Sequence, residues 1–159
     1  MRARDWSTNL EDYPDNPEAS TTIESTCVED VFDASGDDSR DKATPLFLET
    51  TQEHNLCGLG DVDWVSFAGQ AGVKLMVVGT SISGGAAVNL EIYNSAGELQ
   101  ASAQAAGLGK SAAFLWTPPE TATYYLKTTP LVEGLAGSDA RYQLWIGQPK
   151  ELYLPVMGR

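Results

Sequence analysis

The sequence predicts an all-β fold of the sandwich or barrel class, and three observations support this prediction. Val65 and Phe67 fall on one face of the segment 64–67. The intervening Trp64 and Ser66 fall on the other face, which is the period of two expected of a half-buried strand. The 15 glycines and 8 prolines of this 159-residue chain separate short runs rich in Val, Leu, Tyr and Thr. No segment of the sequence has a convincing helical periodicity.

Nine segments have the length and composition of strands. In chain order they are residues 45–49, 53–57, 63–68, 73–80, 88–94, 99–103, 112–117, 123–129 and 141–147. All nine fall within residues 27–147, which we expect to form one domain. The hydrophobic content of 42% and the charged content of 20% are those of a globular protein.

Two terminal segments differ from this domain in composition. Residues 1–26 form a polar, extended N-terminal arm, which we expect to be disordered when alone. Residues 148–159 form an apolar C-terminal tail, and a free apolar strand usually pairs with a sheet edge of its own molecule or of a neighbour. The apolar residues predicted to make such assembly contacts are Trp6, Leu10, Tyr13, Leu152, Leu154 and Val156.

The negative charge is concentrated in the first two-fifths of the chain. Residues 1–63 hold 16 acidic and 4 basic side chains, which accounts for the whole formal net charge of −12. An acidic surface repels phosphate backbones, so we expect no nucleic-acid partner. Such a surface suits a cation or a basic partner, although most of these carboxylates are expected simply to be solvated. No apolar segment approaches the length needed to span a bilayer.

The turn before the alternating segment carries two aspartates, Asp61 and Asp63, with one residue between them. At the start of a strand, two carboxylates at this spacing can turn their oxygens toward one point. The turn is therefore either a cap, in which the carboxylates accept bonds from backbone amides, or one half of a cation site.

Five motifs occur in order along the domain. One is the segment 60–67, Gly-Asp-Val-Asp-Trp-Val-Ser-Phe, and the other four lie in residues 30–43, 88–97, 116–127 and 142–146. Together they resemble the motifs of the pre-peptidase C-terminal domain, a family of non-catalytic sandwich modules in secreted bacterial proteins, and the segment 60–67 is similar to the family signature. The sequence departs from the family pattern at Ser35 and Gly36, where Glu and Pro are usual, and at Ala122, where Gly is usual. The resemblance implies a jelly-roll-like, antiparallel β-sandwich and no enzymatic activity.

The resemblance also implies a calcium site, because some collagen-binding relatives bind calcium through corresponding acidic segments. The predicted ligands are Asp37, Asp38, Asp61 and Asp63. Ser35 replaces a glutamate that would be a ligand, and Asp33 is a candidate substitute. The alternative is that these aspartates only cap turns and satisfy backbone amides.

The two cysteines, Cys27 and Cys57, bracket the acidic opening of the domain. They form either a disulfide or two buried thiols. Because exported sandwich modules live in oxidising surroundings, we favour the disulfide, which would stabilise the fold by roughly 3–4 kcal/mol. Two cysteines and one histidine are too few soft ligands for a zinc site.

Catalysis has little support in the sequence. A nucleophilic triad needs a base, and the one histidine, His54, is expected to be a surface residue of a strand. The N-terminus has no apolar core of a signal peptide, which taken alone indicates a cytoplasmic protein. Because the resemblance and the cysteine pair imply export, we expect the chain to be a processed or excised piece of a longer exported precursor.

Two functions compatible with a secreted or cell-surface location compete. In the first, the chain is a structural subunit that assembles with identical copies, in filaments or other polymers, by donating strands from its termini. In the second, it is a targeting or substrate-binding appendage of a secreted peptidase.

Overall fold

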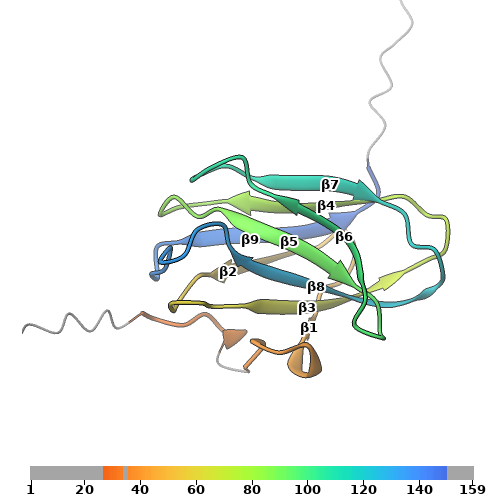
Figure 1. Cartoon of the computed structure of the whole chain (residues 1–159), viewed down its shortest axis with the longest axis horizontal. Coiled ribbons are helices and arrows are strands. Elements are labelled where there is room, and N and C mark those ends of the chain that lie inside the picture. Colours follow the sequence, from red (N-terminus) through yellow and green to blue (C-terminus); the bar gives the residue numbers. More distant parts are fainter. Residues whose placement is uncertain (1–26, 34–35, 150–159) are drawn as a thin grey trace, which may run out of the picture.

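A computed structural model of the chain describes residues 27–33 and 36–149 and arranges nine strands in two sheets. One sheet has the order β1 (Thr44–Pro45), β3 (Asp63–Gly69), β8 (Ala122–Pro130), β5 (Val88–Tyr93) and β6 (Leu99–Gln104). The other has the order β2 (Thr51–Asn55), β9 (Arg141–Gly147), β4 (Leu75–Ser81) and β7 (Ala112–Trp116). Figure 1 shows the two sheets as stacked layers.

Strands β2 to β9 have the connectivity of a jelly roll. Successive strands pass from one sheet to the other, except β5 and β6, which pair in the same sheet. Strand β1 is an additional edge strand that pairs with β3 in parallel, with Thr44 opposite Val65. All other strand pairs in the described residues are antiparallel. The predicted jelly-roll-like sandwich is therefore confirmed, with one parallel pair added to it.

The core lies between the sheets and follows from the alternation in the sequence. In β3 the side chains of Val65 and Phe67 point inward, and their cross-strand partners Leu126 and Tyr124 in β8 are buried with them. The opposite sheet contributes buried side chains at alternate positions of β4 and β9. Each large apolar side chain buried in this way stabilises the fold by about 1.5–3 kcal/mol.

The predicted strand 45–49 is mostly a turn. Strand β1 ends at Pro45, the Thr50 amide donates to the Phe47 carbonyl at 3.2 Å, and Glu49 has a φ of 64°. A positive φ does not continue a strand, so the chain leaves the edge of β3 here and crosses to β2. Strand β2 consequently begins at Thr51, two residues before the predicted start.

Residues 36–43 lie along the edge of β3 and include a short 3-10 turn, η2 (Arg40–Lys42), drawn in orange in Figure 1. Within the described residues, no helix is long and apolar enough to cross a membrane. The predicted assembly residues Trp6, Leu10, Tyr13, Leu152, Leu154 and Val156 lie outside the described residues.

Candidate metal centre

The acidic opening of the domain is held against the sandwich at the start of β3. A disulfide joins Cys27 to Cys57, as favoured from the sequence, with a Cα–Cα distance of 5.4 Å. The backbone amide of Trp64 donates a hydrogen bond to the carbonyl of Asp37 at 2.9 Å. These two contacts bring the segment 27–38 next to the Gly60–Phe67 turn, although more than twenty residues separate them in sequence.

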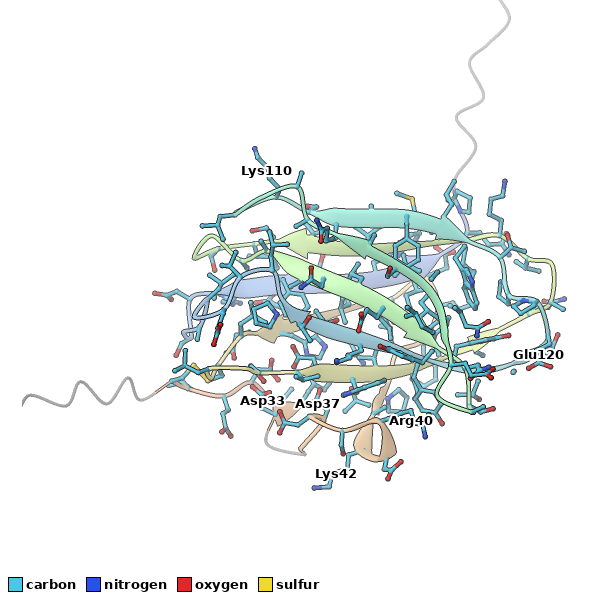
Figure 2. All side chains as sticks on the ribbon, viewed as in Figure 1. Asp33, Asp37, Arg40, Lys42, Lys110 and Glu120 are labelled. Carbon is cyan, nitrogen blue, oxygen red and sulfur yellow. A yellow bond between two sulfur atoms is a disulfide. The ribbon has the colours of Figure 1, made fainter. Side chains whose placement is uncertain are left out.

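Five aspartates meet at this junction, and we call them the acidic cluster. They are Asp30, Asp33, Asp37, Asp61 and Asp63. Figure 2 shows Asp33 and Asp37 close together beside the edge of β3, on the side opposite Lys110.

Asp30 and Asp33 are positioned by a tight turn. The Asp30 carboxylate accepts hydrogen bonds from the amides of Phe32 at 2.7 Å and Asp33 at 3.2 Å. The Asp33 carboxylate in turn accepts a bond from the Asp30 amide at 3.1 Å. The second oxygen of Asp30 accepts the amide of Asn55, at the end of β2, at 2.9 Å. The capping interpretation therefore describes Asp30 well.

Asp61 is also partly satisfied by the backbone, because its Oδ2 accepts a hydrogen bond from the Cys57 amide. Asp37 and Asp63 differ from Asp61 in their burial and in their hydrogen bonds. Both are completely buried, with 0% of their surface exposed. Neither carboxylate oxygen of Asp37 has a hydrogen-bond partner among the described residues, and the same is true of Asp63 Oδ1. A buried carboxylate without a partner is unfavourable, so it calls for a proton or a cation.

The remaining oxygen of Asp63 is held from the opposite sheet. The Tyr142 hydroxyl, on β9, donates a hydrogen bond to Asp63 Oδ2. The pKa of Tyr142 is raised well above its ordinary value, mainly by burial and also by the charge of Asp63. The hydroxyl therefore stays protonated and remains a hydrogen-bond donor. The hydrogen bond fixes the orientation of the Asp63 carboxylate and leaves Oδ1 directed at the cluster.

His54 lies beside these carboxylates, which corrects the prediction of a surface position. It is only 1% exposed and packs between the rings of Phe32 and Tyr142. Its Nδ1 lies 3.5 Å from Asp63 Oδ1 and 4.0 Å from Asp37 Oδ2. His54 is opposite Tyr142 of β9, whose side chain is buried between the sheets, so the strand alternation itself turns His54 inward, and Phe32 of the opening segment packs against its ring.

Burial lowers the pKa of His54 by itself, but the contact with Asp63 and the charges of Asp63, Asp30 and Asp37 outweigh it. The net effect is a raised pKa. The imidazole is thus a local positive counterion for the cluster when it carries two protons.

In contrast to His54, the carboxylates of the cluster are less stable in their charged forms, because burial and mutual repulsion both disfavour ionisation. Burial and then the charges of Asp30 and Asp61 raise the pKa of Asp33 to about 7. Burial and then the charge of Asp63 raise the pKa of Asp37 to about 7 and that of Asp61 to about 6. Ionisation of these carboxylates near neutral pH therefore lowers the stability of the native protein.

Two groups of side chains have ligand atoms within 4.8 Å of one another. The first, Asp33, Asp61 and Asp63, offers oxygen atoms alone, and the second, Asp30, His54 and Asp63, adds a nitrogen. Beside the first group lies a hollow of about 240 Å³, whose acidic lining residues are Glu29, Asp33, Asp38 and Asp61. Carboxylate oxygens are the ligands of hard cations, so the all-oxygen group and its open hollow are a candidate cation site.

Of the four predicted ligands, the structure brings Asp61 and Asp63 into one group of ligand atoms. Asp37 belongs to neither group and lies beside the second, with its Oδ2 4.0 Å from His54 Nδ1. The fourth, Asp38, is exposed and lines the hollow from its rim. Asp33, the candidate substitute for the family glutamate, is in the all-oxygen group with Asp61 and Asp63. Asp30 was missed, although its position three residues before Asp33 in the acidic opening was a signal of a shared turn.

Neither a family model nor a curated protein matches this chain. Among solved structures, it is similar to the pre-peptidase C-terminal domain of a collagenase from Bacillus anthracis, with 23% identity and a TM-score of 0.50. That match covers 65% of this chain and 93% of the collagenase domain.

The chain is also similar to CorA, a surface-associated copper-binding protein important in copper acquisition by Methylomicrobium album BG8. The identity is 9% and the TM-score 0.49, over 67% of this chain and 98% of the other. At these identities a likeness concerns the fold. The collagenase match confirms, at the level of the fold, the resemblance to pre-peptidase C-terminal domains that the five motifs indicated.

Proposed function

We propose that this chain is a non-catalytic module of an exported protein, and that its acidic cluster binds calcium. The bound ion fastens the segment 27–43 to the sandwich. The observation that carries this proposal is the pair of fully buried carboxylates of Asp37 and Asp63 at the junction of the two segments: both oxygens of Asp37, and Oδ1 of Asp63, have no hydrogen-bond partner among the described residues.

The physical role of the ion follows from where the carboxylates come from. Asp33 and Asp37 belong to the opening segment, whereas Asp61 and Asp63 belong to the sandwich. A cation bound between these two sets of carboxylates neutralises their mutual repulsion and links the opening segment to the sandwich. The raised pKa values of Asp33, Asp37 and Asp61 mean that these carboxyl groups bind protons near neutral pH. Because calcium binds deprotonated carboxylates, it competes with these protons.

Export is supported by the disulfide and by the fold. Disulfides such as Cys27–Cys57 persist in oxidising compartments and are rare in the cytosol. A module with the fold of a collagenase domain suits an appendage of a secreted peptidase, and we retain that function as one candidate for the parent protein.

Limited proteolysis tests the fastening directly. Trypsin cleaves after Arg40 and Lys42, which lie in η2 of the opening segment, and after the exposed Lys110, at the far side of the sandwich in Figure 2. After treatment with a chelator, added calcium should slow cleavage at Arg40 and Lys42 and leave cleavage at Lys110 unchanged. Magnesium should protect less, because it requires a smaller and more regular set of ligands. Equal cleavage rates at η2 with and without calcium would refute the proposal.

A second candidate function is self-assembly through strand addition from the termini. The observation that favours it is the apolar exposure at the sheet edges: Leu99 on β6 is 53% exposed and Leu115 on β7 is 57% exposed. An edge of this kind can template another strand. Donor and acceptor surfaces would differ, so the contact would propagate unless rotation closes a ring.

Sedimentation of the full chain against a variant lacking residues 1–26 tests assembly. The full chain should form oligomers that grow with concentration, and the shortened chain should remain a folded monomer. A full chain that is monomeric at every concentration leaves the appendage as the function of the module.

A further inference from the structure

An apolar groove lies at the end of the short strand β1. It has a volume of about 220 Å³, and its apolar lining residues are Pro45, Leu46, Phe47, Leu48, Phe67 and Ala68. The Phe47 ring is 74% exposed in spite of its position against this groove. Burial of this exposed aromatic side chain against the apolar groove would stabilise the protein, because apolar surface would be removed from water.

The groove runs beside an edge of β3 that lacks a strand partner. Strand β1 pairs with β3 only as far as Ser66, whereas β3 continues to Gly69. The Leu46 amide donates to the Ser66 carbonyl at 2.8 Å, so the polar groups of Ser66 face the β1 side. Because strands alternate with a period of two, the amide and carbonyl of Ala68 face the same open side. This edge therefore offers one further amide and one further carbonyl to an added strand.

The described chain ends beside the groove. The Gln148 amide, just after β9, donates a hydrogen bond to the Glu49 side chain at 2.6 Å, and the Glu49 amide donates to the Ile146 carbonyl at 2.8 Å. A Cβ added at Gly147 would meet the Glu49 carboxylate and the Trp145 ring, so the Glu49 side chain packs closely over the backbone here. Glu49 is only two residues beyond Phe47. The last residues of the chain thus start next to the open edge.

Those last residues, 150–159, have the sequence expected of an edge strand. In an extended strand Leu152, Leu154 and Val156 would fall on one face, and Pro155 lacks an amide that a central strand would need. Ten extended residues reach at most about 33 Å, ample for a groove two residues from the exit point. An attached segment also has the advantage of a high effective concentration over any free peptide.

We propose that residues 150–159 of this chain add as a strand to the edge of β3 that is left unpaired beyond the end of β1 at Pro45. The added strand covers Phe47 and the groove. The backbone of the tail pairs with Ala68, and its alternating apolar side chains contact Phe47 and Phe67. The occupant is this segment of the same chain, since Gln148 is held at Glu49, the residue that follows Leu48 of the groove lining.

Photo-crosslinking in the full chain tests this docking. The substitution Phe47→p-benzoylphenylalanine keeps an aromatic ring at an exposed position, and the matched control places the same residue at Leu115 on β7. Irradiation of a mixture of ¹⁵N-labelled and unlabelled protein should give, from position 47, adducts to residues 150–159 of monomer mass and a single isotope label. Position 115 should give no adduct to the tail.

Amide exchange supplies a second readout. Deleting residues 150–159 should speed exchange of the Ala68 amide by about tenfold or more, and leave the Val65 amide, which faces β8, unchanged. The substitution Ala68→Pro, which removes the amide on the open side, should abolish the adduct from position 47.

Three results would overturn the proposal. Adducts of dimer mass with mixed labels would assign the groove to the tail of a second copy. Equal crosslinking to the tail from positions 47 and 115 would show a tail without a fixed place. Unchanged exchange at Ala68 after the deletion would show that no strand pairs there in the full chain.

Discussion

The substitution Asp37→Asn separates the two roles that a buried carboxylate of the acidic cluster can have. Asparagine has nearly the same shape but no charge. If Asp37 is a ligand held in place by calcium, the substitution should stabilise the metal-free protein and abolish the effect of calcium. If Asp37 is a structural hydrogen-bond acceptor, the substitution should destabilise the protein in both conditions.

The size of the effect follows from the raised pKa of Asp37. A rise from 3.8 to about 7 corresponds to about 3 units, so ionising this group in the native state at pH 8 costs up to about 4 kcal/mol. His54 lies 4.0 Å away and loses a neighbouring charge on substitution, which offsets part of the gain. We therefore expect Asp37→Asn to stabilise the metal-free protein by roughly 1–2 kcal/mol at pH 8.

Thermal unfolding measures this difference. For a chain of this length, 1 kcal/mol shifts Tm by about 2–4 °C, so the variant should melt about 2–8 °C above the parent in chelator at pH 8. At pH 4 native Asp37 is neutral, while the unfolded group, with a pKa of 3.8, is partly ionised, so most of the difference should be lost. Calcium at about a hundred times its Kd should stabilise the parent by about 2.7 kcal/mol and leave the variant unchanged.

Asp41→Asn is the matched control, because Asp41 lies in the same segment, in η2, and is exposed. It changes the net charge equally and should leave the calcium response intact. A lower Tm for Asp37→Asn in chelator at pH 8 would refute the reasoning, and so would a calcium response of the same size as that of the parent.

Three further predictions concern the same junction. The native pKa values of Asp33, Asp37 and Asp61 exceed the unfolded value of 3.8, so the native state binds more protons between pH 4 and 7. The stability of the metal-free protein should consequently fall as pH rises through this window, and saturating calcium should flatten the profile. Denaturant melts at several pH values check this, and rising metal-free stability would contradict it. Tyr142→Phe leaves a buried oxygen of Asp63 without its donor and should cost about 1–3 kcal/mol, whereas an unchanged unfolding midpoint would show that the bond is dispensable. Reduction of the disulfide, whose cysteines are 30 residues apart, should cost roughly 3–4 kcal/mol and weaken calcium binding; two free thiols in the native protein, found by mass, would contradict the disulfide itself.

Much of the fold could be predicted from the sequence because it depends on local patterns. The alternation that places Val65 and Phe67 on one face fixes the buried side of β3, and the predicted strand 141–147 has the bounds observed for β9. The segment 45–49 was wrong as a strand because its end depends on a distant partner. Glu49 adopts a positive φ where its amide pairs with Ile146, nearly a hundred residues away.

For the candidate site, the sequence alone determined that Asp61 and Asp63 share a turn and that Cys27 and Cys57 bracket an acidic segment. Both features depend on residues near in sequence, whose spacing limits their geometry. Only the tertiary structure decided that His54 lies among the carboxylates, since Asp37 and Asp63 come from segments on either side of it in the sequence. It alone also brought Tyr142, from the last strand, onto Asp63, because the jelly roll folds β9 beside β2 whatever their separation in sequence.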